Sequence, residues 1–198
     1  MPTPPSDRFQ ALSLDEACNA DRASLPDDLA PPAALTRSFG AQAFRGMPFL
    51  LGSPGAANVV LVADEPATIA AGGLTARYLV FVHYVADRPS NYLPGFADTD
   101  RDGNDLGDHV ADYVLRYADG TDHAHPIRRR FAIQQARIGW GASPFAAVPL
   151  LADQVMASSA EDQAAGRTPS AYGRGETRHN SGRDAGPGGW LYALPNPH

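Results

Sequence analysis

The chain has 198 residues, of which 43% are hydrophobic, and a formal net charge of −6 at pH 7. The length and composition predict one globular domain with a substantial core. The acidic balance argues against nucleic acid as the main partner, because neutralising phosphates requires a basic surface. All sixteen residues in the Lys+Arg count are arginine, which excludes Schiff-base chemistry, a Walker-type phosphate lysine and a Ser–Lys dyad in this chain.

Cys18 is the only cysteine, so the chain cannot form an internal disulfide or a thiolate metal cluster. The first residues lack the basic and apolar blocks of a signal peptide, and no apolar run approaches the ~20 residues that span a bilayer. We therefore expect a soluble protein without a membrane span, cytoplasmic as the sequence is written. A leader removed from a longer precursor would also fit this sequence.

Residues 1–35 are rich in Pro, Asp and Ala and predict an irregular N-terminal arm, which either lies on the domain or acts as a linker. One interpretation of Leu12–Ala20 is a short helix, because Ser13 is a favourable N-cap and acidic residues follow it. The globular domain is expected over residues 36–198.

Four strands are predicted in the first half of the domain. They are Phe44–Gly52 with an interruption at Pro48, Asn58–Val62, Ala67–Ala70 and Arg77–Val85. The last of these is apolar on both faces, as a central strand between two layers should be. It contains His83, for which a core position with a hydrogen bond to the backbone is favoured over a role as a metal ligand.

The segment from Ala86 to His109 is a long acidic loop with carboxylates at alternating positions. The candidate ligands for a calcium ion are Asp98, Asp100, Asp102, Asn104 and Asp108. A complete EF-hand is excluded, because His109 stands where the bidentate Glu is needed and no flanking helices are predicted. A weaker calcium loop and a solvated acidic turn both remain open.

Residues Ala111–Arg130 predict a β-hairpin with Asp119-Gly120 in its turn, because glycine adopts the positive φ that a tight turn needs. In the first strand, Tyr113, Leu115 and Tyr117 share one face, and mostly polar residues share the other. This alternation predicts a hairpin with one face toward the core.

The second strand of the hairpin carries His123 and His125 on one face, a spacing that can ligate zinc. A third ligand would have to come from His83 or His109 through space. Exposed histidines on a hairpin are the favoured interpretation, with a metal site as the alternative.

The strand ends in Arg128–Arg130, the only run of basic residues. Alternation places Arg128 and Arg130 on one face and Arg129 on the other. A solvated strand end is favoured over an anion site.

The last third of the chain is less regular. Ile138–Gly141 predicts a short extended piece, Val148–Ala157 a weak helix, Ser158–Gly189 a loop unable to build a core, and Trp190–Pro197 a terminal strand. We therefore expect long loops between the later strands.

Aromatic residues in this region suggest a sugar-binding surface. The candidate contacts are Arg137, Trp140, Tyr172, Trp190 and Tyr192. A flat ring can cover the apolar face of a sugar, which predicts ligand contact near Trp140. Packing in the core is favoured for Trp190, because it lies in a predicted strand, whereas packing and ligand contact stay equally open for Trp140.

Several short motifs occur in a defined order along the chain. They are Phe44–Gly52, Leu79–Tyr84, Asp108–Gly120, Pro126–Arg128, Ile138–Trp140 and Trp190–Pro197. In this order they resemble the galactose-binding-like β-sandwich accessory domains of multidomain bacterial hydrolases and lyases, over residues 39–197. The resemblance implies an all-β, two-layer antiparallel β-sandwich of jelly-roll type. Such domains continue past Asn-Pro into one more strand, so a partner polypeptide, or the remainder of a larger protein, is expected to cover the resulting edge.

The function that the resemblance implies is a non-catalytic accessory or binding module of a larger bacterial hydrolase, in contact with carbohydrate or a similar polar substrate. Two alternatives stay open. One is an independent carbohydrate-binding protein with a structural calcium. The other is a small metal-dependent hydrolase that uses His123 and His125. No nucleophilic or paired-carboxylate set can be assigned from the sequence.

Overall fold

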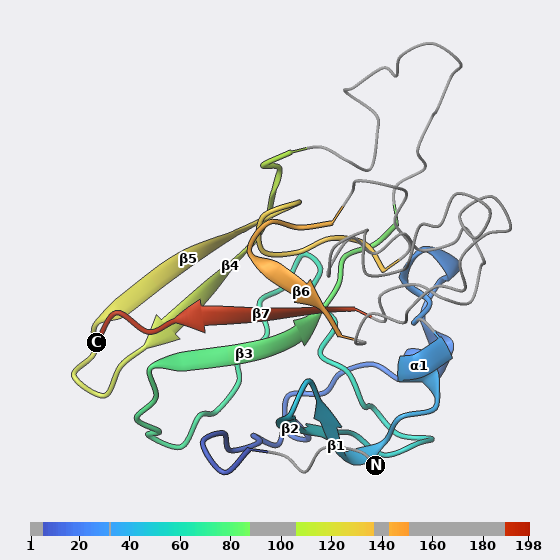
Figure 1. Ribbon diagram of the computed structural model, residues 1–198, viewed down its shortest axis with the longest axis horizontal. Helices are drawn as coiled ribbons and strands as arrows, with labels where there is room; N and C mark the ends of the chain where they lie inside the picture. The colour runs from blue at the N-terminus through green and yellow to red at the C-terminus, as the bar shows by residue number, and fades with distance from the viewer. Residues whose placement is uncertain (1–5, 32, 88–105, 137–142, 151–188) are drawn as a thin grey trace, which may run out of the picture.

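The computed structural model describes residues 6–31, 33–87, 106–136, 143–150 and 189–198 (Figure 1). Over these residues the chain is all-β, apart from the one-turn helix α1 (Ala33–Thr36) and two 3-10 turns at Arg22–Ser24 and Asp27–Leu29. The strands are β1 (Gly40–Phe44), β2 (Met47–Leu51), β3 (Tyr78–His83), β4 (His109–Arg116), β5 (Asp122–Arg128), β6 (Ala147–Pro149) and β7 (Trp190–Pro195).

The described strands form three antiparallel sheets: the hairpin β1–β2, the sheet β3–β7–β6 and the hairpin β4–β5 (Figure 1). Neighbouring residues of β7 join different core clusters, because successive side chains of a strand point to opposite faces. Leu191 packs in a cluster that includes residues of β1 and β2, and Tyr192 packs in a second cluster with residues of β4 and β5. The central sheet is thus covered on both faces, an arrangement of stacked antiparallel sheets consistent with a β-sandwich.

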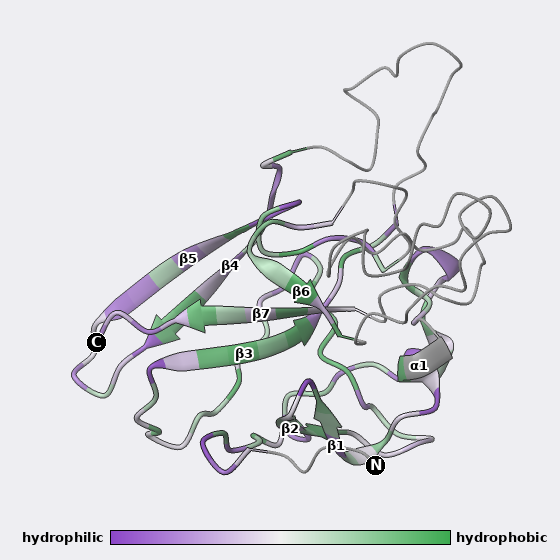
Figure 2. Cartoon of the chain, viewed as in Figure 1, coloured by the Kyte–Doolittle hydropathy of each residue, from purple (hydrophilic) through white to green (hydrophobic). Residues whose placement is uncertain are grey.

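The predicted strands Arg77–Val85 and Trp190–Pro197 are confirmed as β3 and β7, which pair along their whole length from Tyr78↔Pro195 to His83↔Trp190. β3 is the most continuously apolar strand in the view of Figure 2, whereas β5 is mostly hydrophilic. The helix expected over Val148–Ala157 does not begin at Val148, because Val148 and Pro149 belong to β6, which pairs with β7 at Val148↔Leu191. Residues 151–157 lie outside the described residues.

The predicted strand Phe44–Gly52 is in fact the second half of a hairpin. Arg45 and Gly46 both have positive φ, 50° and 78°, and these values turn β1 into β2 with Phe44 opposite Met47. Pro48 lies opposite Ala43 inside β2. This two-stranded ribbon tolerates it, because each of its strands has one side without a ladder partner among the described residues.

The predicted strands Asn58–Val62 and Ala67–Ala70 do not form. Val59 makes only an isolated bridge with Ala20. The Asn19 side chain donates to Leu61 O (2.9 Å) and accepts from Leu61 N (2.7 Å). The N-terminal segment therefore supplies the backbone partners that a neighbouring strand would have given.

The buried Arg22 fixes the N-terminal segment to the rest of the chain. Its guanidinium donates to Leu35 O and to Ser38 O, both at 2.7 Å, and lies 4.0 Å from the centre of the Phe39 ring. The helix expected over Leu12–Ala20 is limited to a single turn, in which Ala17 N and Cys18 N both donate to Leu14 O. No helix in the described part of the chain is long and apolar enough to cross a membrane.

Candidate functional site

Most of the predicted ligand residues lie outside the described residues. This applies to Arg137, Trp140 and Tyr172 in the carbohydrate surface and to Asp98, Asp100, Asp102 and Asn104 in the calcium loop. Their roles stay predictions. Asp108 and Trp190 are described.

Trp190 is a core residue with 0% of its surface exposed. Its indole N–H donates to Gln135 O at 3.0 Å, which satisfies its polar atom inside the protein. A ring without an exposed face cannot stack on a sugar, so Trp190 is a packing residue, as the sequence favoured, and its inclusion among the candidate ligand contacts is corrected. Asp108 precedes β4, and its backbone carbonyl accepts from Arg129 N at 2.8 Å.

His83 joins β3 to β4 through one ring nitrogen and to the segment after β5 through the other. Its Nε2 lies 2.9 Å from Ala132 O, and its Nδ1 lies 2.7 Å from the Tyr113 hydroxyl. A carbonyl can only accept, so Nε2 carries the hydrogen and Nδ1 accepts from Tyr113. Burial lowers the pKa of His83 to about 4 and raises that of Tyr113 to about 12. His83 is therefore a neutral core residue, as the sequence favoured, and is not a metal ligand.

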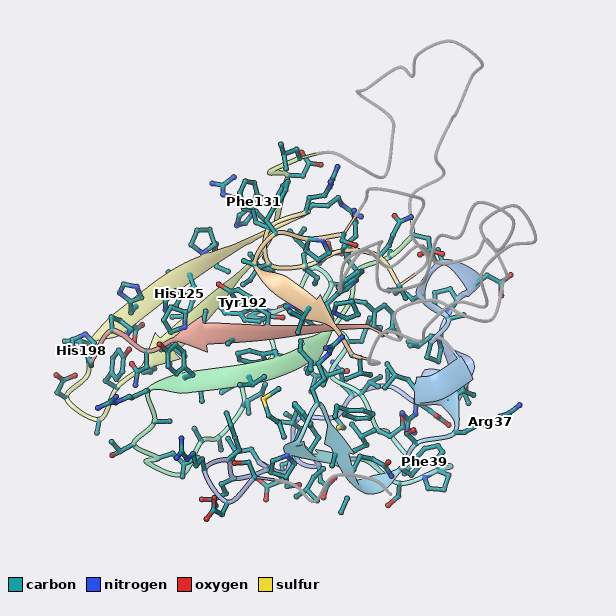
Figure 3. The ribbon with its side chains drawn as sticks, in the orientation of Figure 1. Arg37, Phe39, His125, Phe131, Tyr192 and His198 are labelled. Carbon is teal, nitrogen blue, oxygen red and sulfur yellow. The ribbon has the colours of Figure 1, made fainter. Side chains whose placement is uncertain are left out.

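His123 and His125 share one face of β5, as predicted, with their ring centres 4.5 Å apart. They are partly buried and not exposed, because that face also carries the fully buried Ile127. Figure 3 shows His125 on the side of the hairpin that faces β7. Burial, and to a smaller extent His123, lower the pKa of His125.

A third metal ligand does not join this pair within the described chain. His109 bonds Asp112 instead, with Nε2 and Oδ1 3.0 Å apart. Among the described residues, no group of three or more His, Cys, Asp or Glu side chains is placed to hold a metal ion. The His83 and His109 partners considered for a zinc site are thus engaged elsewhere.

The Arg128–Arg130 run ends the hairpin in a tight turn rather than a solvated strand end. Phe131 N and Ala132 N both donate to Arg128 O, at 3.1 and 3.0 Å, and Arg130 adopts a positive φ of 62°. Arg129 is buried and donates to the side chain of Gln134 at 3.2 Å. The three consecutive arginines therefore differ: Arg128 is exposed, Arg129 is buried, and Arg130 forms the turn with its positive φ.

An exposed aromatic surface lies just beyond this turn. Phe131 is 43% exposed and Phe145 is 68% exposed, with their ring centres 5.6 Å apart. Phe145 N donates to Arg130 O and Ala146 N to Phe131 O, both at 2.9 Å, so the two segments run side by side. We call Phe131 and Phe145 the aromatic surface. Figure 3 places Phe131 at the end of the hairpin opposite His198.

Arginine side chains border the aromatic surface. The Arg130 guanidinium lies 5.6 Å from the centre of the Phe145 ring. The exposed Arg128 donates from Nη1 to Gly107 O at 2.9 Å. Gly107 is next to the surface, because a Cβ at this glycine would lie 3.8 Å from Phe131 Cε2. Apolar ring faces and cationic donors are thus available together.

The sequence did not reveal the aromatic surface. Strand alternation from Ile127 places Arg129 and Phe131 on the buried face. Arg129 follows that rule, but the positive φ of Arg130 breaks the alternation and turns Phe131 outward. A positive φ at arginine is uncommon and has no reliable sequence signal. Comparisons with protein families, with curated proteins and with solved structures found no match for this chain.

Proposed function

We propose that the chain is a non-catalytic accessory module of a larger hydrolase that binds carbohydrate or a similar polar ligand. The observation that carries this proposal is the aromatic surface, in which Phe131 and Phe145 are exposed side by side. Its apolar members gather at one end of the hairpin, and exposed patches of this kind mark binding sites.

The chemistry of the aromatic surface suits a sugar. Phenylalanine has no polar atom, so Phe131 and Phe145 can contribute only ring faces, and these match the C–H face of a pyranose. Hydroxyl groups at the edge of the sugar need donors, which the exposed Arg128 supplies next to Gly107. The combination supports stacking with hydrogen bonds at the rim.

A partner polypeptide is part of the same proposal. In the described part of the chain, β3 pairs with β7 on one side and has no ladder partner on the other. Tyr78 at the start of β3 is 58% exposed. An uncovered edge of this kind accepts a further strand, so β3 is the edge where the rest of a larger protein, or another chain, would pair.

The carbohydrate proposal is tested by affinity electrophoresis of the full chain against a panel of soluble polysaccharides. The Phe145→Ala variant is expected to weaken retention about tenfold, since one lost stacking contact is worth about 1.4 kcal/mol. Tyr78→Ala is the matched control, because it removes an exposed aromatic ring away from the aromatic surface. Retention on no polysaccharide, or equal retention of wild type and Phe145→Ala, would overturn the proposal.

A further inference from the structure

We propose that the ligand of the aromatic surface carries a carboxylate, so that the module selects uronate-containing polysaccharides over neutral ones. This inference rests on the proposed function and specifies its substrate class. It comes from Arg128, whose guanidinium is held by a hydrogen bond to the carbonyl oxygen of Gly107, the glycine that Phe131 borders.

Arg128 is held in place and still has donors to offer. It is exposed, and a single nitrogen, Nη1, is engaged by Gly107 O at 2.9 Å. Arginine has five N–H donors in a planar fork, so most of them remain available to a ligand. Asp112, an acidic residue of the adjacent strand, is bonded to His109 at 3.0 Å. The guanidinium is therefore oriented without being neutralised by a carboxylate of the described chain.

The Phe131 ring and the Arg128 guanidinium both lie next to Gly107. Phe145 lies 5.6 Å from Phe131 between ring centres. Phe131 borders Gly107, whose carbonyl holds Arg128. A sugar stacked on these rings would bring a substituent of its own ring, or of the next residue in the polymer, toward the guanidinium.

A carboxylate is the sugar substituent that forms the strongest hydrogen bonds with this guanidinium. Arg and carboxylate form paired, charge-assisted hydrogen bonds about twice as strong as those of neutral groups. A neutral hydroxymethyl group accepts only weakly from the same fork. The chain as a whole has a net charge of −6, so attraction of an anionic polymer requires a local cationic group such as Arg128.

The test compares polygalacturonate with its methyl ester, which keeps the sugar ring and the linkage but removes the charge. The full chain is expected to bind polygalacturonate about tenfold more tightly than the ester by isothermal titration. Arg128→Gln should remove this preference, because it should weaken binding of the acid about tenfold more than binding of the ester. Added salt should weaken binding of the acid only, because the contact is exposed.

Arg116→Gln is the matched control. Arg116 is also an exposed arginine of the hairpin, but it pairs with Asp122 at 3.2 Å near the turn. Its replacement should not alter the preference. Equal affinity for the acid and the ester, or a preference that survives Arg128→Gln, would overturn this inference while leaving the proposed function in place. Binding of neither polymer would also overturn it. Failure on every polysaccharide of the panel would overturn the proposed function as well.

Discussion

The two faces of the central sheet are packed by different kinds of side chain. On one face, Val80, Val82 and Leu191 meet the hairpin β1–β2 in a mostly aliphatic cluster, which also includes Phe44, Phe49 and Tyr84. On the other, Phe81 and His83 of β3 meet the hairpin β4–β5. There the ring of Tyr113 lies 4.7 Å from that of Phe81, and the ring of Tyr192 is stacked 5.9 Å from that of His83. We call these the aliphatic face and the aromatic face.

The difference shows that the two faces of one sheet can be stabilised by two kinds of interaction. The aliphatic face contributes stability through buried apolar surface and filled volume. Neither contribution needs a particular bond direction, and neither changes with pH. The aromatic face depends on a placed donor and acceptor, since His83 bonds Ala132 O and the Tyr113 hydroxyl. Its contribution to folding stability should therefore change when one hydrogen-bonding atom is replaced or when His83 is protonated. The contribution of the aliphatic face should not change in either case.

The largest effect is expected on the aliphatic face. Leu191 is 3% exposed at the centre of its cluster. Leu191→Ala should lower the free energy of unfolding by about 2–5 kcal/mol, from lost burial and the cavity that remains. Urea denaturation near pH 7 and near pH 5 should give the same loss. A loss that changes with pH, or falls below about 1 kcal/mol, would contradict the description of this face.

Acid should selectively weaken the aromatic face. The pKa of His83 falls from its ordinary value of 6.5 to about 4 in the folded state. Between these values the unfolded chain binds the proton and the folded chain does not, so stability is complete above pH 6.5 and is lost as the pH falls toward 4. The shift corresponds to roughly 3 kcal/mol. Wild-type stability measured by urea denaturation across this range should fall by that amount more than in a variant without His83.

His83→Gln is the matched variant, because its amide offers one donor and one acceptor but does not titrate. Comparing it with wild type removes the contribution of the carboxylates, which titrate in both. The difference in stability between the two chains should narrow as the pH falls. A parallel pH dependence in both proteins would show that His83 does not control the response of the aromatic face.

Two strands of the central sheet, β3 and β7, and the turn of the hairpin β4–β5 were predictable because their signals are local. The apolar run Arg77–Val85 and the segment Trp190–Pro197 became β3 and β7, and Asp119-Gly120 formed the expected turn, with Gly120 at a φ of 86°. Segment Asn58–Val62 has the same composition as a strand, but its backbone pairs with Asn19 and Ala20, about 40 residues earlier in the chain. Composition cannot reveal a partner at that distance.

The aromatic surface was hidden for a different physical reason. Alternation along β5 correctly placed His123, His125 and Ile127 on one face. The surface depends on the next step, where one backbone angle at Arg130 turns Phe131 outward and brings it beside Phe145. The φ angle of Arg130 thus decides whether Phe131 is a core residue or an exposed candidate ligand contact.

The smallest effect is expected at the turn that sets the register of the hairpin on the aromatic face. Gly120 has a φ of 86°, and nothing lies within 4 Å of the position a Cβ would take, so substitution there costs backbone strain alone. Gly120→Val should destabilise the fold by about 1–3 kcal/mol and lower the melting midpoint by several degrees. Gly120→Asn should recover most of the loss, because asparagine tolerates positive φ. An unchanged midpoint in the valine variant would mean that this turn does not position the aromatic face. A full loss in the asparagine variant as well would mean that something other than φ requires glycine there.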